Sequence, residues 1–186
     1  MDGLTLLFIR HAEKPGEEWP GPGLRIDGQP DDKSLVIRGW QRAGAWAALF
    51  GSGPAEQDYP RPEAIYAAKP DMAGGPGVSQ RPYDTVVPLS QKLQIPIIAN
   101  FAKGEEPALA EHLVTLAGTV LICWEHKSLA KSLLPAVTGN VPAAAMPAQW
   151  DGERFDVVLR LDRTNAQWTG RQLFPRLLGG DTDQPL

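Results

Sequence analysis

The stretch Leu4–Glu13 reads LTLLFIRHAE, and its character changes abruptly after Ile9. Residues 4–9 are almost wholly apolar and do not alternate with polar residues, which is typical of a strand buried on both faces inside a parallel sheet. Arg10 and His11 follow directly. In open α/β sheets, ligands bind in the crevice beyond the carboxyl ends of the strands. The sequence therefore places a cation and an imidazole where a reactive pair is expected.

A second apolar run, Thr119–Trp124, is followed by Glu125 and His126. It has the same pattern as the first stretch, a buried strand that delivers a histidine at its carboxyl end. One such histidine is most often a hydrogen-bonded structural residue. Two histidines at equivalent places on two buried strands favour a shared functional site.

The rest of the chain alternates strand and helix patterns, which predicts a mainly parallel sheet with helices on both faces and hence the α/β class. Ser34 and Ser79 are expected to cap the first two helices, and Gly118 to end the third. The alternating pattern at 155–162 predicts a half-exposed antiparallel or edge strand near the C-terminus. The expected strands are 4–10, 63–68, 95–99, 119–124, 155–162 and 167–174, and the expected helices are 35–50, 79–93, 107–117 and 127–137. Residues 1–186 are expected to form one domain.

The composition is that of an ordinary globular protein, with 42% hydrophobic and 22% charged residues. A net charge of −4 gives no overall attraction to nucleic acid or anionic lipid, so we expect neither as a partner. The start lacks a basic signal region, and no apolar run approaches a bilayer span, so a cytoplasmic location is expected. Cys123, the single cysteine, is expected to be a packing residue.

Two segments rich in glycine and proline, 15–32 and 69–78, are expected to be loops. Loops of this length in compact domains are often lids or binding loops, although disorder is the alternative. Trp19 in the first loop would serve as the apolar wall of a pocket. Substrate specificity is expected to depend on both loops.

Four motifs now stand in order along nearly the whole chain. They are Arg10-His11 after an apolar strand, Leu35-x-x-Arg38-Gly39, Ser79-x-Arg81-x-x-x-Thr85, and a second strand ending in His126. This ordered set resembles the histidine phosphatase superfamily, also called the phosphoglycerate mutase-like fold. The opening motif is weak alone, whereas the ordered set is fairly specific.

The resemblance implies that His11 is the nucleophile that accepts a phosphoryl group, and that Arg10, Arg81 and His126 bind its oxygens. These residue types suit the chemistry. A neutral imidazole nitrogen can attack phosphorus near pH 7, and guanidinium groups match phosphoryl oxygens with paired donors. Arg38 is expected to support the site from behind rather than touch the phosphoryl group.

The leaving alcohol must receive a proton, and the resemblance implies a carboxylic acid after the third strand. We prefer Glu105 over Glu106 there, and Glu125 and Glu13 remain possible. Two carboxylates before a helix could equally complement its dipole. The resemblance implies no metal or other cofactor, and His112, the third histidine, makes no metal-ligand spacing with the others.

The sequence departs from the family pattern at two places. Ala12 stands where glycine is commoner, and His126 is flanked by Trp124, Glu125 and Lys127 rather than by small residues. The leading hypothesis is a metal-independent phosphoric monoester hydrolase that acts through a phosphohistidine on a small phosphorylated metabolite or a phosphoprotein. Its alternatives are a phosphoglycerate-mutase-type phosphotransferase, disfavoured by the lack of an obvious basic cluster in the loops, and a non-catalytic phospho-ligand binding module. The oligomeric state stays open.

Overall fold

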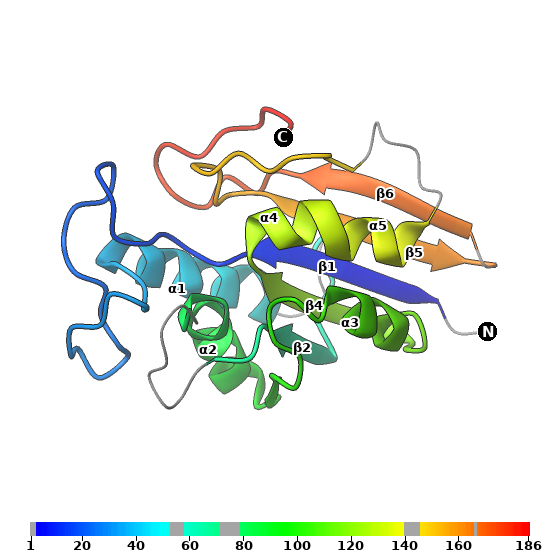
Figure 1. Ribbon diagram of the computed structural model, residues 1–186, viewed down its shortest axis with the longest axis horizontal. Coiled ribbons are helices and arrows are strands. Elements are labelled where there is room, and N and C mark those ends of the chain that lie inside the picture. Colours follow the sequence, from blue (N-terminus) through cyan, green and yellow to red (C-terminus); the bar gives the residue numbers. More distant parts are fainter. Residues whose placement is uncertain (1–2, 53–57, 71–78, 140–145, 166) are drawn as a thin grey trace.

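The computed structural model describes residues 3–52, 58–70, 79–139, 146–165 and 167–186. It contains one six-stranded sheet in the order β3-β2-β4-β1-β5-β6 (Figure 1). β3, β2, β4 and β1 are parallel, whereas β5 runs antiparallel to β1, and β6 runs antiparallel to β5. The strands are β1 (Leu4–Arg10), β2 (Ala64–Ala67), β3 (Ile97–Ile98), β4 (Gly118–Trp124), β5 (Val158–Thr164) and β6 (Gln167–Leu173). The α/β class and the antiparallel edge near the C-terminus are confirmed.

Helices cover both faces of the sheet, as expected. On one face, α3 (Glu106–Leu113) and the helical segment 126–138 pack against side chains of β1 and β4 such as Phe8 and Ile122. On the other face, α1 (Ile37–Gly51) and α2 (Arg81–Leu93) pack against alternate residues of the same strands, such as Leu7 and Leu121. β1 therefore buries both of its sides, which explains its unbroken apolar sequence.

The first two helices begin later than the predicted caps. α1 begins at Ile37, and Ser34 does not cap it because its hydroxyl donates to Asp31 Oδ2 at 2.8 Å. α2 begins at Arg81 rather than at a Ser79 cap, although Ser79 Oγ accepts a hydrogen bond from the Arg81 N–H at 3.2 Å. Local side-chain hydrogen bonds in the preceding turns thus replaced the expected capping.

Gly39 explains why a glycine is tolerated inside α1. A Cβ atom at this position would lie 2.5 Å from the Glu13 carbonyl oxygen. The segment that leaves β1 therefore passes directly against the first turn of α1, and this close approach holds residues 11–13 at the carboxyl end of the sheet.

Two further boundaries were wrong. Gly118 does not end α3, which stops at Leu113; instead Gly118 begins β4 with φ of +80°. The helix expected over 127–137 is continuous but is divided into α4 (His126–Ser128), a π-helical turn η1 (Leu129–Leu133) and α5 (Leu134–Thr138). Periodicity alone predicts neither a π turn nor a strand that opens on a left-handed glycine.

The alternating segment 155–162 was placed too early, because β5 begins at Val158. Val157, Val158 and Leu159 are all fully buried, so the start of this strand is not half-exposed. Phe155 lies before the strand and contributes to the functional site described below. No helix among the described residues is long and apolar enough to cross a bilayer. Residues 71–78 of the second predicted loop lie outside the described residues.

Candidate active site

His11 and His126 meet at the carboxyl ends of β1 and β4, which are neighbours in the sheet (Figure 1). The register pairs Arg10 with Trp124, and the backbone N–H of His11 donates to the Trp124 carbonyl at 3.1 Å. The two imidazole rings consequently lie 6.3 Å apart between centroids, at an interplanar angle of 76°. The structure thus brings together two histidines that are separated by most of the chain.

The hydrogen bond of His11 fixes which ring nitrogen is free. Nδ1 lies 2.8 Å from the Ala12 carbonyl oxygen, which can only accept, so Nδ1 carries the proton and Nε2 carries the lone pair. Burial, reinforced by the charge of Arg10, lowers the pKa of His11 from 6.5 to about 3. The ring is therefore neutral at pH 7, and Nε2 is available as a nucleophile.

Thr85 on α2 anchors the residue that orients His11. Its hydroxyl accepts a hydrogen bond from the Ala12 N–H at 2.8 Å and donates to the Arg81 carbonyl at 2.7 Å. Thr85 is fully buried. The hydroxyl thus connects the segment after β1 to the first turn of α2, from which Arg81 projects.

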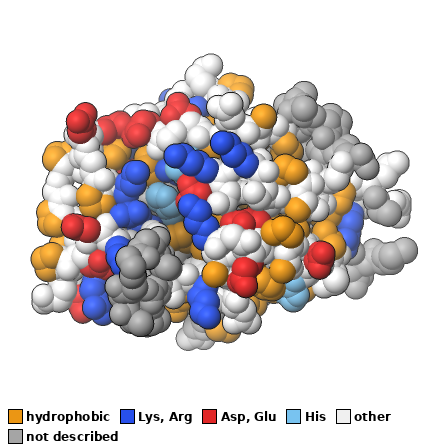
Figure 2. All heavy atoms as spheres, in the orientation of Figure 1, with side chains coloured by type: hydrophobic (Ala, Val, Ile, Leu, Met, Phe, Trp, Pro, Cys, Tyr) orange, Lys and Arg blue, Asp and Glu red, His pale blue; other side chains and the backbone are white. Residues whose placement is uncertain are grey.

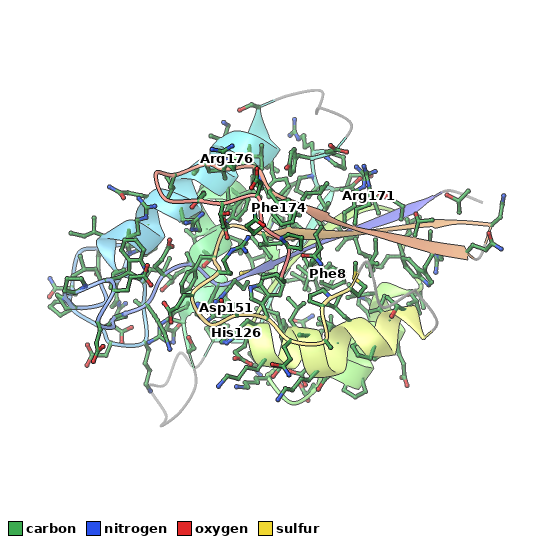
Figure 3. The ribbon with its side chains drawn as sticks, turned by 90° about the horizontal axis from the view of Figure 1, so that it is seen from above. Phe8, His126, Asp151, Arg171, Phe174 and Arg176 are labelled. Carbon is green, nitrogen blue, oxygen red and sulfur yellow. The ribbon has the colours of Figure 1, made fainter. Side chains whose placement is uncertain are left out.

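Arg10 is 1% exposed and lies above the ring of Phe155, with its Cζ 3.8 Å from the ring centroid. Its Nη1 donates to the carbonyls of Asp151, Gly152 and Arg154. Figure 3 labels Asp151, in the segment before β5, and His126, at the start of α4. Nε and Nη2 are buried and have no hydrogen-bond partner among the described residues. Burial lowers the pKa of Arg10 to about 10, so it remains charged at pH 7 with unused donors.

Arg81 reaches the same region from α2. Its Nε donates to the Ser34 carbonyl at 3.2 Å, and its Nη2 donates to the Asp32 carbonyl. Both acceptors are neutral. Burial lowers the pKa of Arg81, and nearby carboxylates oppose that effect. These contacts hold a guanidinium at the edge of the site without placing a carboxylate directly on it.

His11, Arg81 and His126 line one cavity of about 670 Å³, whereas Arg10, which was expected to bind the phosphoryl group with them, is not among its lining residues. Five cationic side chains share the lining, against a single carboxylate, Glu125. They are Lys14, Lys69, Arg81, Lys103 and Lys127. Figure 2 shows the basic side chains gathered around a histidine on this face. The cavity therefore suits an anion, and the fold gathers a basic cluster that was not obvious in the loops of the sequence.

His126 lies close to its neighbour Glu125, although its buried Nδ1 has no hydrogen-bond partner among the described residues. Nδ1 of the ring lies 3.2 Å from Glu125 Oε1, while Glu125 Oε2 accepts the Ser128 N–H at 2.9 Å. Burial lowers the pKa of His126 to about 4, with a further contribution from Arg10, although Glu125 acts in the opposite direction. Both histidines of the site are therefore neutral at pH 7.

Glu125 is ionised at pH 7. Burial alone would raise its pKa, but the N–H groups of Ser128 and Lys127 outweigh that effect, with help from the Lys103 ammonium 3.4 Å away. The resulting pKa is about 2. A bound phosphoryl dianion would raise it, because like charges disfavour ionisation.

Of the four candidate carboxylates, the structure brings only Glu125 into the cavity lining among the described residues. Glu105, the preferred residue, instead accepts the Ala102 N–H at 2.7 Å. Glu106 is buried and accepts from the Trp124 indole at 2.9 Å and from the Gly104 N–H. Glu13 is fully buried and pairs with Arg42 at 2.8 Å. All three carboxylates therefore stabilise loops or helices around the site.

Several site residues were not predicted from the sequence. Phe155 lies 6.2 Å from the His11 ring, centroid to centroid, and supports Arg10. Lys14 and Lys127 lie within three residues of the two histidines, so proximity in sequence could have indicated them. Lys69 and Lys103 follow β2 and β3, and only the parallel order of the sheet brings them to this edge.

The described residues contain no group of three or more histidine, cysteine, aspartate or glutamate side chains that could hold a metal ion. His112 instead lies in α3 with its Nε2 2.8 Å from the Tyr66 hydroxyl. Cys123 is buried, and burial raises the pKa of its thiol, which suits a packing role. A metal-independent reaction remains a prediction.

The sequence matches no protein-family model and no curated protein. Solved structures do resemble the fold. A mycobacterial glucosyl-3-phosphoglycerate phosphatase has a TM-score of 0.54 and 15% identity, and the match covers 90% of this chain and 97% of that one. The protein histidine phosphatase SixA, complexed with tungstate, has a TM-score of 0.52 and 14% identity, with coverage of 92% and 97%. A mycobacterial hydrolase has a TM-score of 0.50 and 14% identity, with coverage of 94% and 90%.

These likenesses extend over nearly all of each protein, so the chain has the histidine phosphatase fold that the ordered motifs predicted. At this level of identity they establish the fold and leave the chemistry to the residues of this chain.

Proposed function

We propose that this protein is a metal-independent phosphatase that works through a phosphohistidine on His11. The observation that carries the proposal is the hydrogen bond from His11 Nδ1 to the Ala12 carbonyl. It leaves the Nε2 lone pair free at a cavity lined mainly by cations. The fold shared with two phosphatases supports the same reaction class.

In the first step, Nε2 of His11 attacks phosphorus and forms an N–P bond while the P–O bond to the leaving alcohol breaks. The unused Nε and Nη2 donors of Arg10, together with Arg81 and neutral His126, would stabilise the negative charge on the phosphoryl oxygens. In the second step, water attacks the phosphohistidine, releases inorganic phosphate and restores the neutral ring.

The leaving oxygen needs a proton, and we assign Glu125 rather than Glu105 to that role. Glu125 is the only carboxylate in the described lining of the cavity. Binding of the phosphoryl dianion would raise its pKa and so favour the protonated form that an acid needs. The same carboxylate could then accept a proton from the attacking water.

A small phosphorylated metabolite fits the cavity better than a bare phosphate would, because about 670 Å³ far exceeds one phosphoryl group. Lys14, Lys69 and Lys127 have no carboxylate partner within salt-bridge distance among the described residues. They favour a substrate with more negative charge than a single phosphoryl group. A phosphoprotein remains the alternative substrate, and the expected cytoplasmic location also remains a prediction.

The same lysines keep the mutase hypothesis in consideration, since a mutase must bind a second anionic group. The two functions differ in where the phosphoryl group goes. Transfer of a labelled phosphoryl group to water supports a phosphatase, and transfer to a second alcohol supports a mutase.

The test of the proposed function is hydrolysis of p-nitrophenyl phosphate by the parent protein and by His11→Ala. We expect turnover in the parent and its loss in the variant. His112→Gln is the matched control, because His112 lies outside the cavity, and it should keep full activity. Phosphate binding with no turnover of any phosphoester would instead favour the non-catalytic binding module.

A further inference from the structure

A second cavity, of about 100 Å³, has four lining residues that each hold a buried polar atom with no hydrogen-bond partner among the described residues. Three are donors: Nε1 of Trp19, Nε of Arg38 and Nη2 of Arg154. The fourth is an acceptor, Oε2 of Glu13, whose side chain is fully buried. Unpaired buried polar atoms are costly, and four on the residues around one cavity favour a polar binding partner there.

The charge of this cavity differs from that of the phosphoryl cavity. Its lining holds three arginines and five carboxylates. Arg42 is paired with Glu13 and Asp181, and Arg154 with Asp156. The remaining carboxylates, Glu18 and Glu153, are joined by a hydrogen bond that raises the pKa of Glu18. Arg38 Nε lies 3.7 Å from Glu13 Oε1, an ion pair that is too long for a hydrogen bond. The cavity therefore repels an anion, and its three donors without a hydrogen-bond partner do not suit a cation.

A neutral hydroxyl group satisfies this set of atoms. Each hydroxyl donates one hydrogen bond and accepts up to two. Two neighbouring hydroxyls can donate to Glu13 Oε2 and accept from the indole and guanidinium N–H groups. A volume of about 100 Å³ exceeds the roughly 30 Å³ of one water. The cavity thus has room for a small group that bears two hydroxyls, or for a few waters.

Shared lining residues connect this cavity to the candidate active site. A third cavity, of about 380 Å³, shares Lys14 with the cavity of His11. It shares Glu18, Trp19, Glu153 and Phe155 with the cavity of Glu13. A ligand with its phosphoryl group at His11 could therefore extend past Lys14 and Phe155 toward Trp19.

We infer that the cavity lined by Glu13, Trp19, Arg38 and Arg154 is a hydroxyl-binding subsite for the end of the substrate remote from the phosphoryl group. The substrate class is then a polyhydroxylated phosphomonoester. The inference rests on the proposed function, because it places the phosphoryl group at His11.

The test compares binding of sorbitol 6-phosphate and hexyl phosphate, which have equal chain length and differ in hydroxyl groups. Calorimetry on the His11→Ala chain measures binding alone, so the result does not depend on turnover. We expect sorbitol 6-phosphate to bind at least tenfold more tightly, since a site built to bond a hydroxyl discriminates against an analogue that lacks it.

Two variants in the same background locate the subsite. Trp19→Phe removes the indole N–H but keeps an aromatic ring, and Arg38→Lys keeps the charge but removes Nε. Each should reduce the preference for the polyol to a few-fold or less. Trp168→Phe and Arg25→Lys are the controls, because both residues lie outside the three cavities, and they should retain the full preference.

Equal binding of the two phosphates would overturn the inference and leave water as the occupant of the cavity. A polyol preference that survives both Trp19→Phe and Arg38→Lys would also overturn it. Failure of the proposed function is a separate result, namely no hydrolysis of p-nitrophenyl phosphate by the parent protein.

Discussion

The hydroxyl of Thr85 accepts a hydrogen bond from the backbone N–H of Ala12 at a distance of 2.8 Å. This bond fixes the peptide next to the carbonyl that holds His11 Nδ1. The tautomer of the proposed nucleophile therefore depends on a residue of α2 that does not itself line the cavity.

Thr85→Val should lower both stability and activity, because it removes the hydroxyl while nearly keeping the shape. The buried Ala12 N–H would lose its partner, at a cost of about 1–3 kcal/mol in the free energy of unfolding. Urea unfolding and p-nitrophenyl phosphate hydrolysis measure the two effects. Thr85→Ser keeps the hydroxyl and should retain most activity; equal loss in both variants would contradict this role.

Glu125→Gln should slow the hydrolysis of substrates in proportion to how poor their leaving groups are. An alkyl phosphate releases a basic alkoxide that needs a proton, whereas p-nitrophenolate leaves without one. We expect a loss of about 10²-fold or more in kcat for the alkyl phosphate and a much smaller loss for the aryl phosphate. Glu105→Gln is the comparison variant. If only this variant lost more kcat for the alkyl phosphate than for the aryl phosphate, Glu105 rather than Glu125 would be the acid.

Lys69→Gln and Lys127→Gln should raise KM most for substrates that carry a second anionic group. Their ammonium groups line the cavity without a carboxylate partner among the described residues. The effect should shrink as ionic strength rises, since salt screens exposed charges. Steady-state kinetics with a bisphosphate and a monophosphate measure it. Lys131 is exposed and lies outside the cavity, so Lys131→Gln should leave the KM for the bisphosphate and for the monophosphate unchanged.

Acidification should destabilise the folded protein through its two active-site histidines. Their pKa values are about 3 and about 4 when folded and near 6.5 when unfolded. As the pH falls below about 6.5, the two histidines become protonated in the unfolded chain but stay neutral in the folded protein. The free energy of unfolding therefore falls. The slope per histidine approaches 1.4 kcal/mol per pH unit, as an order of magnitude.

Burial raises the pKa of Asp84 to about 6, so protonation of Asp84 stabilises the folded protein as the pH falls. This opposes the effect of the histidines, and a variant is therefore needed to isolate their contribution. His126→Gln should lose less stability than the parent between pH 7 and pH 5 in urea unfolding. An unchanged pH dependence in His126→Gln would show that His126 is not held neutral by its surroundings.

Much of this fold was predictable because its strongest signals are local. The apolar runs that became β1 and β4 identified buried strands, and a histidine after each strand identified the edge that carries the site. His11 and His126 were found in this way, and Arg81 came from the family resemblance of the motif Ser79-x-Arg81-x-x-x-Thr85. The structure brings all three to one cavity.

The rest depended on tertiary contacts that a sequence does not display. The sequence favoured Glu105 as the acid, whereas in the structure Glu125 lines the cavity and Glu105 accepts a hydrogen bond from Ala102 instead. The lysines of the cavity come from four different segments, so no local cluster exists to be seen. Phe155 was predicted to begin a strand because it continues the alternating apolar pattern. That pattern does not reveal that the buried Arg10 lies over its ring.

The most direct measurement of the central claim is the site of phosphorylation on the protein. The parent protein is mixed briefly with a phosphoryl donor, quenched in alkali and analysed by mass spectrometry. We predict an alkali-stable, acid-labile phosphoryl group on His11 that is absent from His11→Ala. Rapid turnover of the donor with no such group on His11, or with the group on another residue, would contradict the account.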